Sequence, residues 1–137
     1  MNLTFDTSAL VKVLIGEPGT DLARRLWEGG PPVLSALAYP EVCSALTTAA
    51  RLERVSHAEI ARARQELPTF WGAATVVDVS PPIAVAAGEL AIATGLKGAD
   101  AVHLATALSV GREATVLVTW DKALSRAAQH HGLAVAP

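Results

Sequence analysis

Apolar and polar positions follow two different periods along the chain, which predicts short buried strands separated by helices. Compact apolar runs bounded by turn residues are typical of strands, and apolar residues that recur every three or four positions are typical of helices. Strands are expected at Leu3–Phe5, Pro32–Ser35, Thr75–Val79, Thr115–Thr119 and Leu133–Val135. The run TVLVT at 115–119 is the clearest buried strand of the five.

Glycine, proline and capping residues set the limits of the helices expected between these strands. Seven helices are expected, over residues 8–15, 20–28, 40–52, 56–71, 80–95, 98–111 and 121–132. Ser56 and Glu59 have the spacing of a capping box at the start of the fourth helix. The third and fourth helices are therefore expected to form a hairpin.

The order of these elements predicts the fold class. Strands that alternate with helices imply right-handed crossovers and a sheet that helices cover on both faces. We predict an α/β fold, a three-layer α/β/α sandwich around a mainly parallel sheet of about five strands. The length of 137 residues, without a repeat or a long linker, predicts that residues 1–137 form a single domain.

Four carboxylates lie near the predicted strand ends or helix starts. Asp6 directly follows the first strand, and Asp121 follows the fourth strand after a single residue. Glu41 is in the first turn of the helix after the second strand, whereas Asp100 opens a helix with no strand directly before it. Each acid alone is explained by helix capping or by the helix dipole. In open parallel sheets, however, ligands bind beyond the carboxyl ends of the strands.

Asp6 is the acid that capping explains least well, because an unpaired charge at a buried strand end is unfavourable. Several carboxylates at one edge of a sheet would repel each other unless a divalent cation neutralised them. Carboxylate oxygens suit Mg²⁺ or Mn²⁺, and no Cys/His set has the spacing of a zinc site. Asp6 thus needs a cation, a network of hydrogen-bond donors or a metal, and a metal site here would suit Mg²⁺ or Mn²⁺.

The remaining residues with chemical potential have simpler interpretations. His103 shares a helical face with Asp100, and its role stays open between the site and a cap or core contact. His130 and His131, near a helix end, fit a dipole interaction. The single cysteine, Cys43, is expected to pack in the core, and its isolation predicts a reducing compartment. Without a secretory signal at the start, we expect a cytoplasmic protein.

Composition adds two constraints. Apolar residues make up 51% of the chain and the mean hydropathy is +0.36, yet no uninterrupted apolar run reaches the length of about 18 residues that a membrane helix needs. So high an apolar fraction in a small domain indicates that part of its apolar surface is buried in an interface, in a homo-oligomer or with an obligate partner. The formal net charge of −2 gives no overall basic footprint for nucleic acid, although a local basic patch around an acidic site remains compatible with it.

Four segments together resemble the PIN-domain ribonucleases, and more closely the toxins of VapBC toxin–antitoxin pairs. The segments are FDTSALVKVL, AYPEVCSAL, LKGADAVHLATAL and LVTWDKALSRAA, in the order of the family, from Phe5 to Ala128. The resemblance implies a Mg²⁺- or Mn²⁺-dependent endoribonuclease that hydrolyses RNA phosphodiester bonds and arrests translation and growth. Its products would carry a 5′-phosphate and a 3′-hydroxyl.

The resemblance also implies roles for individual residues. Asp6, Glu41, Asp100 and Asp121 would be catalytic. Asp6 and Asp100 among them would bind metal, directly or through water, while Glu41 and Asp121 would be ligands, water-orienting groups or a general base. Two hydroxyl residues, Ser8 and Thr119, would support the site.

The partners implied by the resemblance are an RNA substrate, a cognate antitoxin and a second copy of the chain. The antitoxin would lay an amphipathic helix in a groove over the active site. Trp27, Trp71 and the aliphatic helix hairpin are candidates for that groove, although core packing is the better default for each.

Three other interpretations remain open at this point. A housekeeping RNA-processing nuclease would use the same four acids. A non-catalytic interaction module would keep only the fold, and the presence of all four acids argues against it. A phosphatase of the haloacid dehalogenase type would need a second aspartate at position 8 as its general acid. This chain has Ser8 there and so lacks that group.

Overall fold

A computed structural model describes all 137 residues and contains one five-stranded parallel sheet. Its strands lie in the order β3-β2-β1-β4-β5, and every neighbouring pair is parallel. The strands are β1 (Asn2–Phe5), β2 (Pro32–Ser35), β3 (Thr75–Val77), β4 (Thr115–Val118) and β5 (Ala134–Ala136). The predicted number of strands and their parallel arrangement are confirmed.

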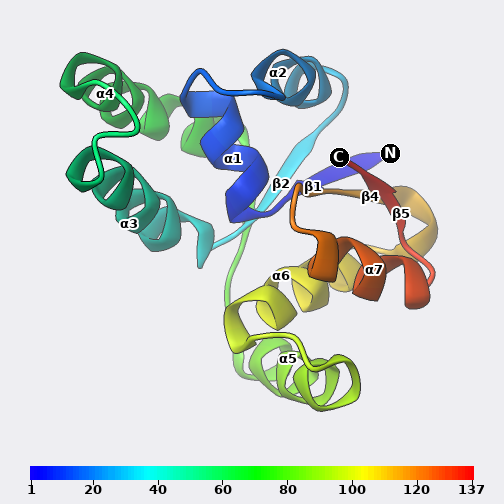
Figure 1. The fold of residues 1–137 in the computed structure, drawn as a ribbon. Helices are drawn as coiled ribbons and strands as arrows, with labels where there is room; N and C mark the ends of the chain where they lie inside the picture. Colours follow the sequence, from blue (N-terminus) through cyan, green and yellow to red (C-terminus); the bar gives the residue numbers. More distant parts are fainter.

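Seven helices cover the two faces of the sheet (Figure 1). Helices α1 to α4 lie on one face, and α5 to α7 lie on the other. The helices are α1 (Thr7–Leu14), α2 (Thr20–Glu28), α3 (Ala38–Arg51), α4 (His57–Ala73), α5 (Pro81–Thr94), α6 (Gly98–Ser109) and α7 (Lys122–His130), with a short 3₁₀ helix η1 (Arg112–Ala114) before β4. The three-layer α/β/α sandwich is thus confirmed.

The core is divided by the sheet into two main clusters. Successive side chains of a strand point to opposite faces, so Val118 of β4 joins the larger cluster, with α1 to α4, and Leu117 joins the smaller one, with α6 and α7. In the larger cluster the rings of Phe5 and Trp27 lie 5.0 Å apart, centroid to centroid. Trp27 is only 9% exposed, so this tryptophan is a core residue.

Three local expectations differ from the structure. Cys43 is exposed, and its predicted core position is wrong, because Val42 and Leu46 occupy the buried face of α3. The Ser56 hydroxyl accepts a hydrogen bond from the Glu59 N–H at 3.2 Å, but the Glu59 carboxylate accepts from the N–H of Gly16 and so leaves the capping box half formed. Strand β3 ends two residues earlier than expected.

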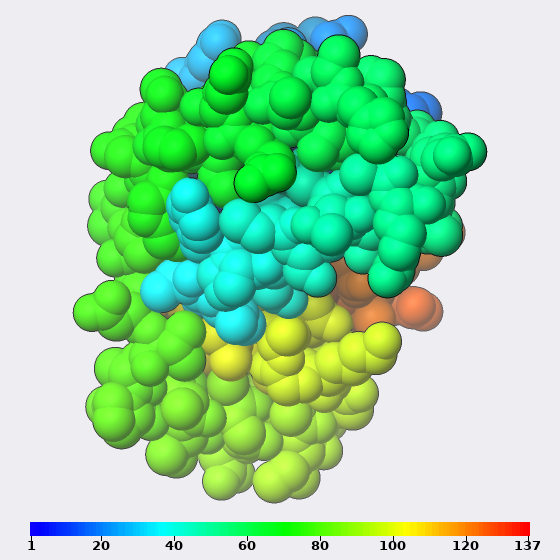
Figure 2. All heavy atoms as spheres, turned by 90° about the vertical axis from the view of Figure 1, so that its left-hand side faces the viewer, coloured from blue at the N-terminus to red at the C-terminus, as the bar shows by residue number.

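Viewed from the side, the α3–α4 hairpin forms one half of the molecular face, and α5 with α6 forms the other (Figure 2). Helix α5 packs chiefly against α6. None of the helices combines the length and the apolar character needed to cross a membrane.

Strand register fixes where the candidate site lies. Phe5 at the end of β1 pairs with Val118 at the end of β4, and the N–H of Asp6 donates to the carbonyl oxygen of Val118 at 3.2 Å. Helices α1 and α7 both begin at this edge. The carboxyl ends of the neighbouring strands β1 and β4 therefore bring residues from opposite ends of the chain together.

Candidate active site

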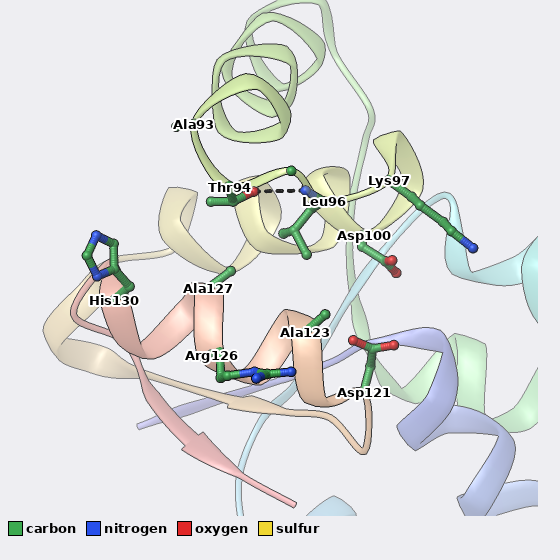
Figure 3. A pocket seen from close by; sticks show the side chains of 11 residues that line it. Ala93, Thr94, Leu96, Lys97, Asp100, Asp121, Ala123, Arg126, Ala127 and His130 are labelled. Atoms are coloured by element: carbon green, nitrogen blue, oxygen red, sulfur yellow. Dashed lines mark hydrogen bonds between the residues drawn. The ribbon is translucent and has the colours of Figure 1, made fainter.

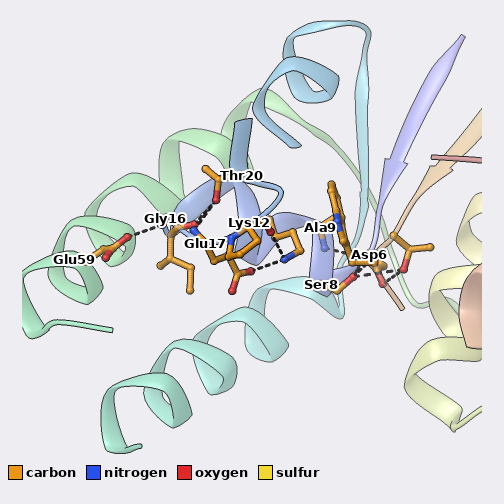
Figure 4. Close-up of polar contacts among 12 residues, drawn as sticks. Asp6, Ser8, Ala9, Lys12, Gly16, Glu17, Thr20 and Glu59 are labelled. Carbon is orange, nitrogen blue, oxygen red and sulfur yellow. Dashed lines mark hydrogen bonds and ion pairs between the residues drawn. The ribbon is translucent and has the colours of Figure 1, made fainter. Parts of the chain in front are cut away.

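Asp6 is a buried carboxylate held by three hydrogen bonds (Figure 4). It is 3% exposed and caps α1: its Oδ1 accepts from the N–H of Ala9 at 2.9 Å and from the Ser8 hydroxyl at 2.7 Å. Its Oδ2 accepts from the Thr119 hydroxyl at 2.6 Å. Burial raises the pKa of Asp6, although the hydrogen bonds from Thr119, Ser8 and Ala9 oppose that rise.

The two hydroxyl residues beside Asp6 also tie it to the start of α7. The Thr119 hydroxyl accepts from the N–H of Asp121 at 3.0 Å, and the Ser8 hydroxyl accepts from the N–H of Trp120 at 3.1 Å. Each hydroxyl thus donates to Asp6 and accepts from the β4–α7 connection. This arrangement places Ser8 and Thr119 where they fix the position of Asp6 relative to Asp121.

Asp100 and Asp121 face each other across the gap between α6 and α7 (Figure 3). Asp121 caps α7, and its Oδ1 accepts from the N–H of Leu124 at 2.7 Å. Asp100, in the first turn of α6, forms no hydrogen bond. Burial raises the pKa of Asp100, and the negative charge of Asp121 adds to this rise. His103 opposes the rise, and Asp6 and Glu41 make smaller contributions to it.

Glu41 is held at one oxygen by two donors from other helices. Its Oε1 accepts from the Thr7 hydroxyl and from Nε2 of His103, both at 2.6 Å. Burial pushes the pKa of Glu41 upward, but these two hydrogen bonds and the positive charge of His103 together lower it below its ordinary value. Its Oε2 has no protein partner, so one oxygen stays available to a water molecule or a cation.

His103 and Thr7 are the residues that sequence reasoning left open or missed. His103 is 2% exposed and its Nδ1 is buried without a partner, while its Nε2 carries the proton donated to Oε1 of Glu41. The signal for His103 was its place on the helical face of Asp100. Thr7 directly follows Asp6, but nothing in its local sequence indicates a bond to residue 41.

The four acids offer hard oxygen donors of unequal availability. Asp100 has two free oxygens, Asp121 and Glu41 have one each, and Asp6 already accepts bonds at both of its oxygens. With the side chains as they stand, no three carboxylate, imidazole or thiol groups converge on a single ion position. A small hard cation that retains several waters suits such spaced carboxylates, and the mutual repulsion felt at Asp100 favours one. The donor set therefore fits Mg²⁺ or Mn²⁺.

We predict that His103→Leu lowers the rate of the RNA cleavage that the sequence leads us to expect by about 10- to 100-fold, the usual loss for a partner that orients a ligand. The fold should be retained, since leucine also removes the unpaired Nδ1. His103→Gln is the matched control, because its amide nitrogen can donate to Oε1 of Glu41 from a similar position. Equal rates for the leucine variant and the wild type, compared in a cleavage assay, would exclude this positioning role.

Comparison with known proteins places the chain in a family. Residues 3–130 match the PIN domain model. The chain is 46% identical to Ribonuclease VapC45 of Mycobacterium tuberculosis over 134 residues, which cover 97% of this chain and 93% of that protein.

Two solved structures share the fold. PAE2754 from Pyrobaculum aerophilum superposes with a TM-score of 0.73 and 25% identity, over 98% of this chain and 83% of that one. VapBC2 from Rickettsia felis, determined with a promoter DNA fragment, gives a TM-score of 0.67 at 16% identity, over 99% and 98% of the two chains. With the parallel sheet and the acids at its carboxyl edge, these similarities show that the chain belongs to the PIN-domain family, alongside the VapC ribonucleases.

Proposed function

We propose that this protein is the endoribonuclease toxin of a toxin–antitoxin pair and that it hydrolyses RNA phosphodiester bonds with the help of Mg²⁺ or Mn²⁺ in the cytoplasm. The observation that carries the proposal is Asp100, which forms no hydrogen bond and whose raised pKa reflects burial and three neighbouring acids. Such an unfavourable group is typical of a functional site. The similarity to proteins named VapC supports a toxin rather than a housekeeping nuclease.

Each acid has a distinct part in this mechanism. Asp100 and Asp6 would hold the cation, directly or through water, with Asp121 opposite Asp100 as a further oxygen donor. A bound divalent cation supplies positive charge for the scissile phosphate and the departing oxygen. Glu41 stays ionised at neutral pH because its pKa is lowered, so its free Oε2 can orient the attacking water. Ser8 and Thr119 keep the Asp6 carboxylate in place.

The test is a cleavage assay with purified protein and structured RNAs in Mg²⁺, Mn²⁺ or EDTA. We expect cleavage with either ion, none in EDTA, and products with 5′-phosphate ends. In parallel, saturating Mn²⁺ at about 100 times its dissociation constant should stabilise the fold by about 2.7 kcal/mol, measurable as a rise in Tm. Cleavage that persists in EDTA would contradict metal dependence. A Tm that does not change when Mn²⁺ is added would contradict the proposed metal site.

Two protein partners belong to the proposal. An antitoxin would cover the active site with an amphipathic helix, and a similar fold from Klebsiella pneumoniae, solved as a toxin–antitoxin complex, supports such a partner. A homodimer is supported by α5, which packs chiefly on α6 and exposes Val85 by 67% and Ile92 by 82%. Light scattering of the wild type beside Ile92→Glu tests the dimer, which the charge should weaken.

A further inference from the structure

A groove leads away from the acids along α7 (Figure 3). It has a volume of about 640 Å³ and runs between the α5–α6 connection and α7. Asp100 and Asp121 lie at one end, His130 lies at the other, and Arg126 lies between them on α7. The groove therefore joins the proposed cleavage position to a cationic side chain.

A second groove, of about 580 Å³, follows the other side of α7. Its walls include Trp120, Lys122 and Gln129. Only Asp121 and Arg126 line both grooves. Arg126 is thus the only positively charged residue that lines both grooves.

The cations of these grooves are free to bind an anion. Of the 11 lysines and arginines in the chain, three line the grooves, namely Lys97, Lys122 and Arg126. All three are exposed and none forms an ion pair. The Nε of Arg126 donates only to the carbonyl oxygen of Lys122, at 3.3 Å, which leaves the other guanidinium N–H groups without a partner. An arginine fork of this kind matches a phosphate.

The size of the groove indicates how much nucleic acid it holds. From Asp121 to His130, α7 rises about 14 Å, a length that a stacked strand at about 3.4 Å per nucleotide covers with about four nucleotides. A volume of about 640 Å³ is in the range of pockets that take drug-sized ligands and is too small for a duplex. The occupant it fits is a single strand.

We propose that single-stranded RNA enters along the α7 groove and that Arg126 binds a phosphate next to the scissile one, with Lys97 as a second phosphate contact. Arg126 and Lys97 are positioning residues, because the acids carry the chemistry. Their charges offset the repulsion that Asp100 and Asp121 exert on the backbone of the substrate. The inference rests on the proposed ribonuclease function and specifies how that same site holds its substrate.

Binding is measured in an Asp100→Asn background with Mg²⁺, so that the RNA is not cut during the experiment. The probe is a short fluorescein-labelled single-stranded RNA, followed by anisotropy across a salt series. Arg126→Gln and Lys97→Gln are each expected to weaken binding about fivefold and to reduce the slope of log K against log salt by about 0.7, the value for one phosphate contact on a single strand. Arg126→Lys should restore most of the affinity.

Arg51→Gln is the matched control, since Arg51 is exposed and unpaired and lies ten residues, or about 15 Å, along α3 from Glu41. It should leave both the affinity and the slope unchanged. In the native Asp100 chain, Arg126→Gln should raise KM and leave kcat within about twofold.

Two results would overturn the inference. The first is that the Asp100→Asn protein binds no RNA. The second is that a double variant at positions 97 and 126 binds RNA with the same affinity as the Arg51→Gln control. Cleavage by the native chain is scored separately, so that its absence, with groove-dependent binding intact, would refute the ribonuclease proposal and leave the groove assignment standing.

Discussion

Replacing Asp100 with asparagine is expected to reduce RNA cleavage by at least about a hundredfold, because Asp100 has both of its oxygens free for a cation. The same change should make the metal-free protein more stable. Its carboxylate forms no hydrogen bond and is repelled by Asp121, so a neutral amide relieves an unfavourable charge. Since the group is partly exposed, solvent screening limits this gain to about 0.5 kcal/mol, or about 2 °C in Tm.

The pH dependence of that gain follows from the direction of the pKa shift. The pKa of Asp100 is raised by folding, so the wild type loses stability relative to the variant as pH rises through the folded pKa. The difference in Tm should be complete at neutral pH and disappear below the ordinary pKa of 3.8, where the carboxyl is protonated in both states. Calorimetry in EDTA between acidic and neutral pH measures it.

Asp21→Asn is the control for Asp100→Asn, because Asp21 is an exposed aspartate in the first turn of α2. It should leave the cleavage rate unchanged and give no rise in Tm. A variant at Asp100 that cleaves RNA at the wild-type rate would remove this residue from the catalytic site. A fall in Tm for that variant would show that its charge contributes favourably to the fold.

Thr119→Val is expected to have the largest effect on stability among the supporting residues. The threonine hydroxyl donates to Oδ2 of Asp6 and accepts from the N–H of Asp121, and valine keeps the shape while removing both bonds. A hydrogen bond to a buried charge contributes about 1.5–3 kcal/mol, so we expect a loss of about 2 kcal/mol and a fall in Tm of about 8 °C. Cleavage should fall about 10- to 100-fold, because Asp6 and Asp121 are no longer tied together.

The same substitution at an exposed position separates this effect from a general effect of valine. Thr47 lies on the surface of α3, where its hydroxyl donates to the carbonyl oxygen of Cys43 at 2.8 Å. Thr47→Val should change the free energy of unfolding by no more than about 0.5 kcal/mol. Thr119→Ser keeps the hydroxyl and should recover most of the activity. Equal denaturation midpoints for Thr119→Val and wild type would contradict the buried network.

Local sequence determined the elements, because periodicity, capping residues and turn glycines act over a few neighbouring positions. It placed all five strands and all seven helices close to their observed bounds. It also indicated that Asp6 was more than a cap, since a charge after a buried strand needs donors or a cation. The family resemblance predicts a site of four acids, Asp6, Glu41, Asp100 and Asp121.

Tertiary structure alone decided which groups touch. Thr7 and His103 meet at Oε1 of Glu41 from positions 34 and 62 residues away in sequence. No local pattern encodes that distance, because it depends on how α1, α3 and α6 pack around the end of the sheet. Similarly, Cys43 is exposed because α3 packs with the neighbouring residue, Val42, toward the core.

The sequence by itself thus determined the fold class, the order of its elements and the acids at the sheet edge, all of which depend on short-range patterns or on family likeness. The structure decided the bonding of each acid: Asp6 enclosed by donors, Glu41 held at one oxygen, and Asp100 left unpartnered beside Asp121. The reason is physical. Hydrogen bonding and charge repulsion depend on distances of a few ångströms between residues far apart in the chain, and only the packed fold sets those distances.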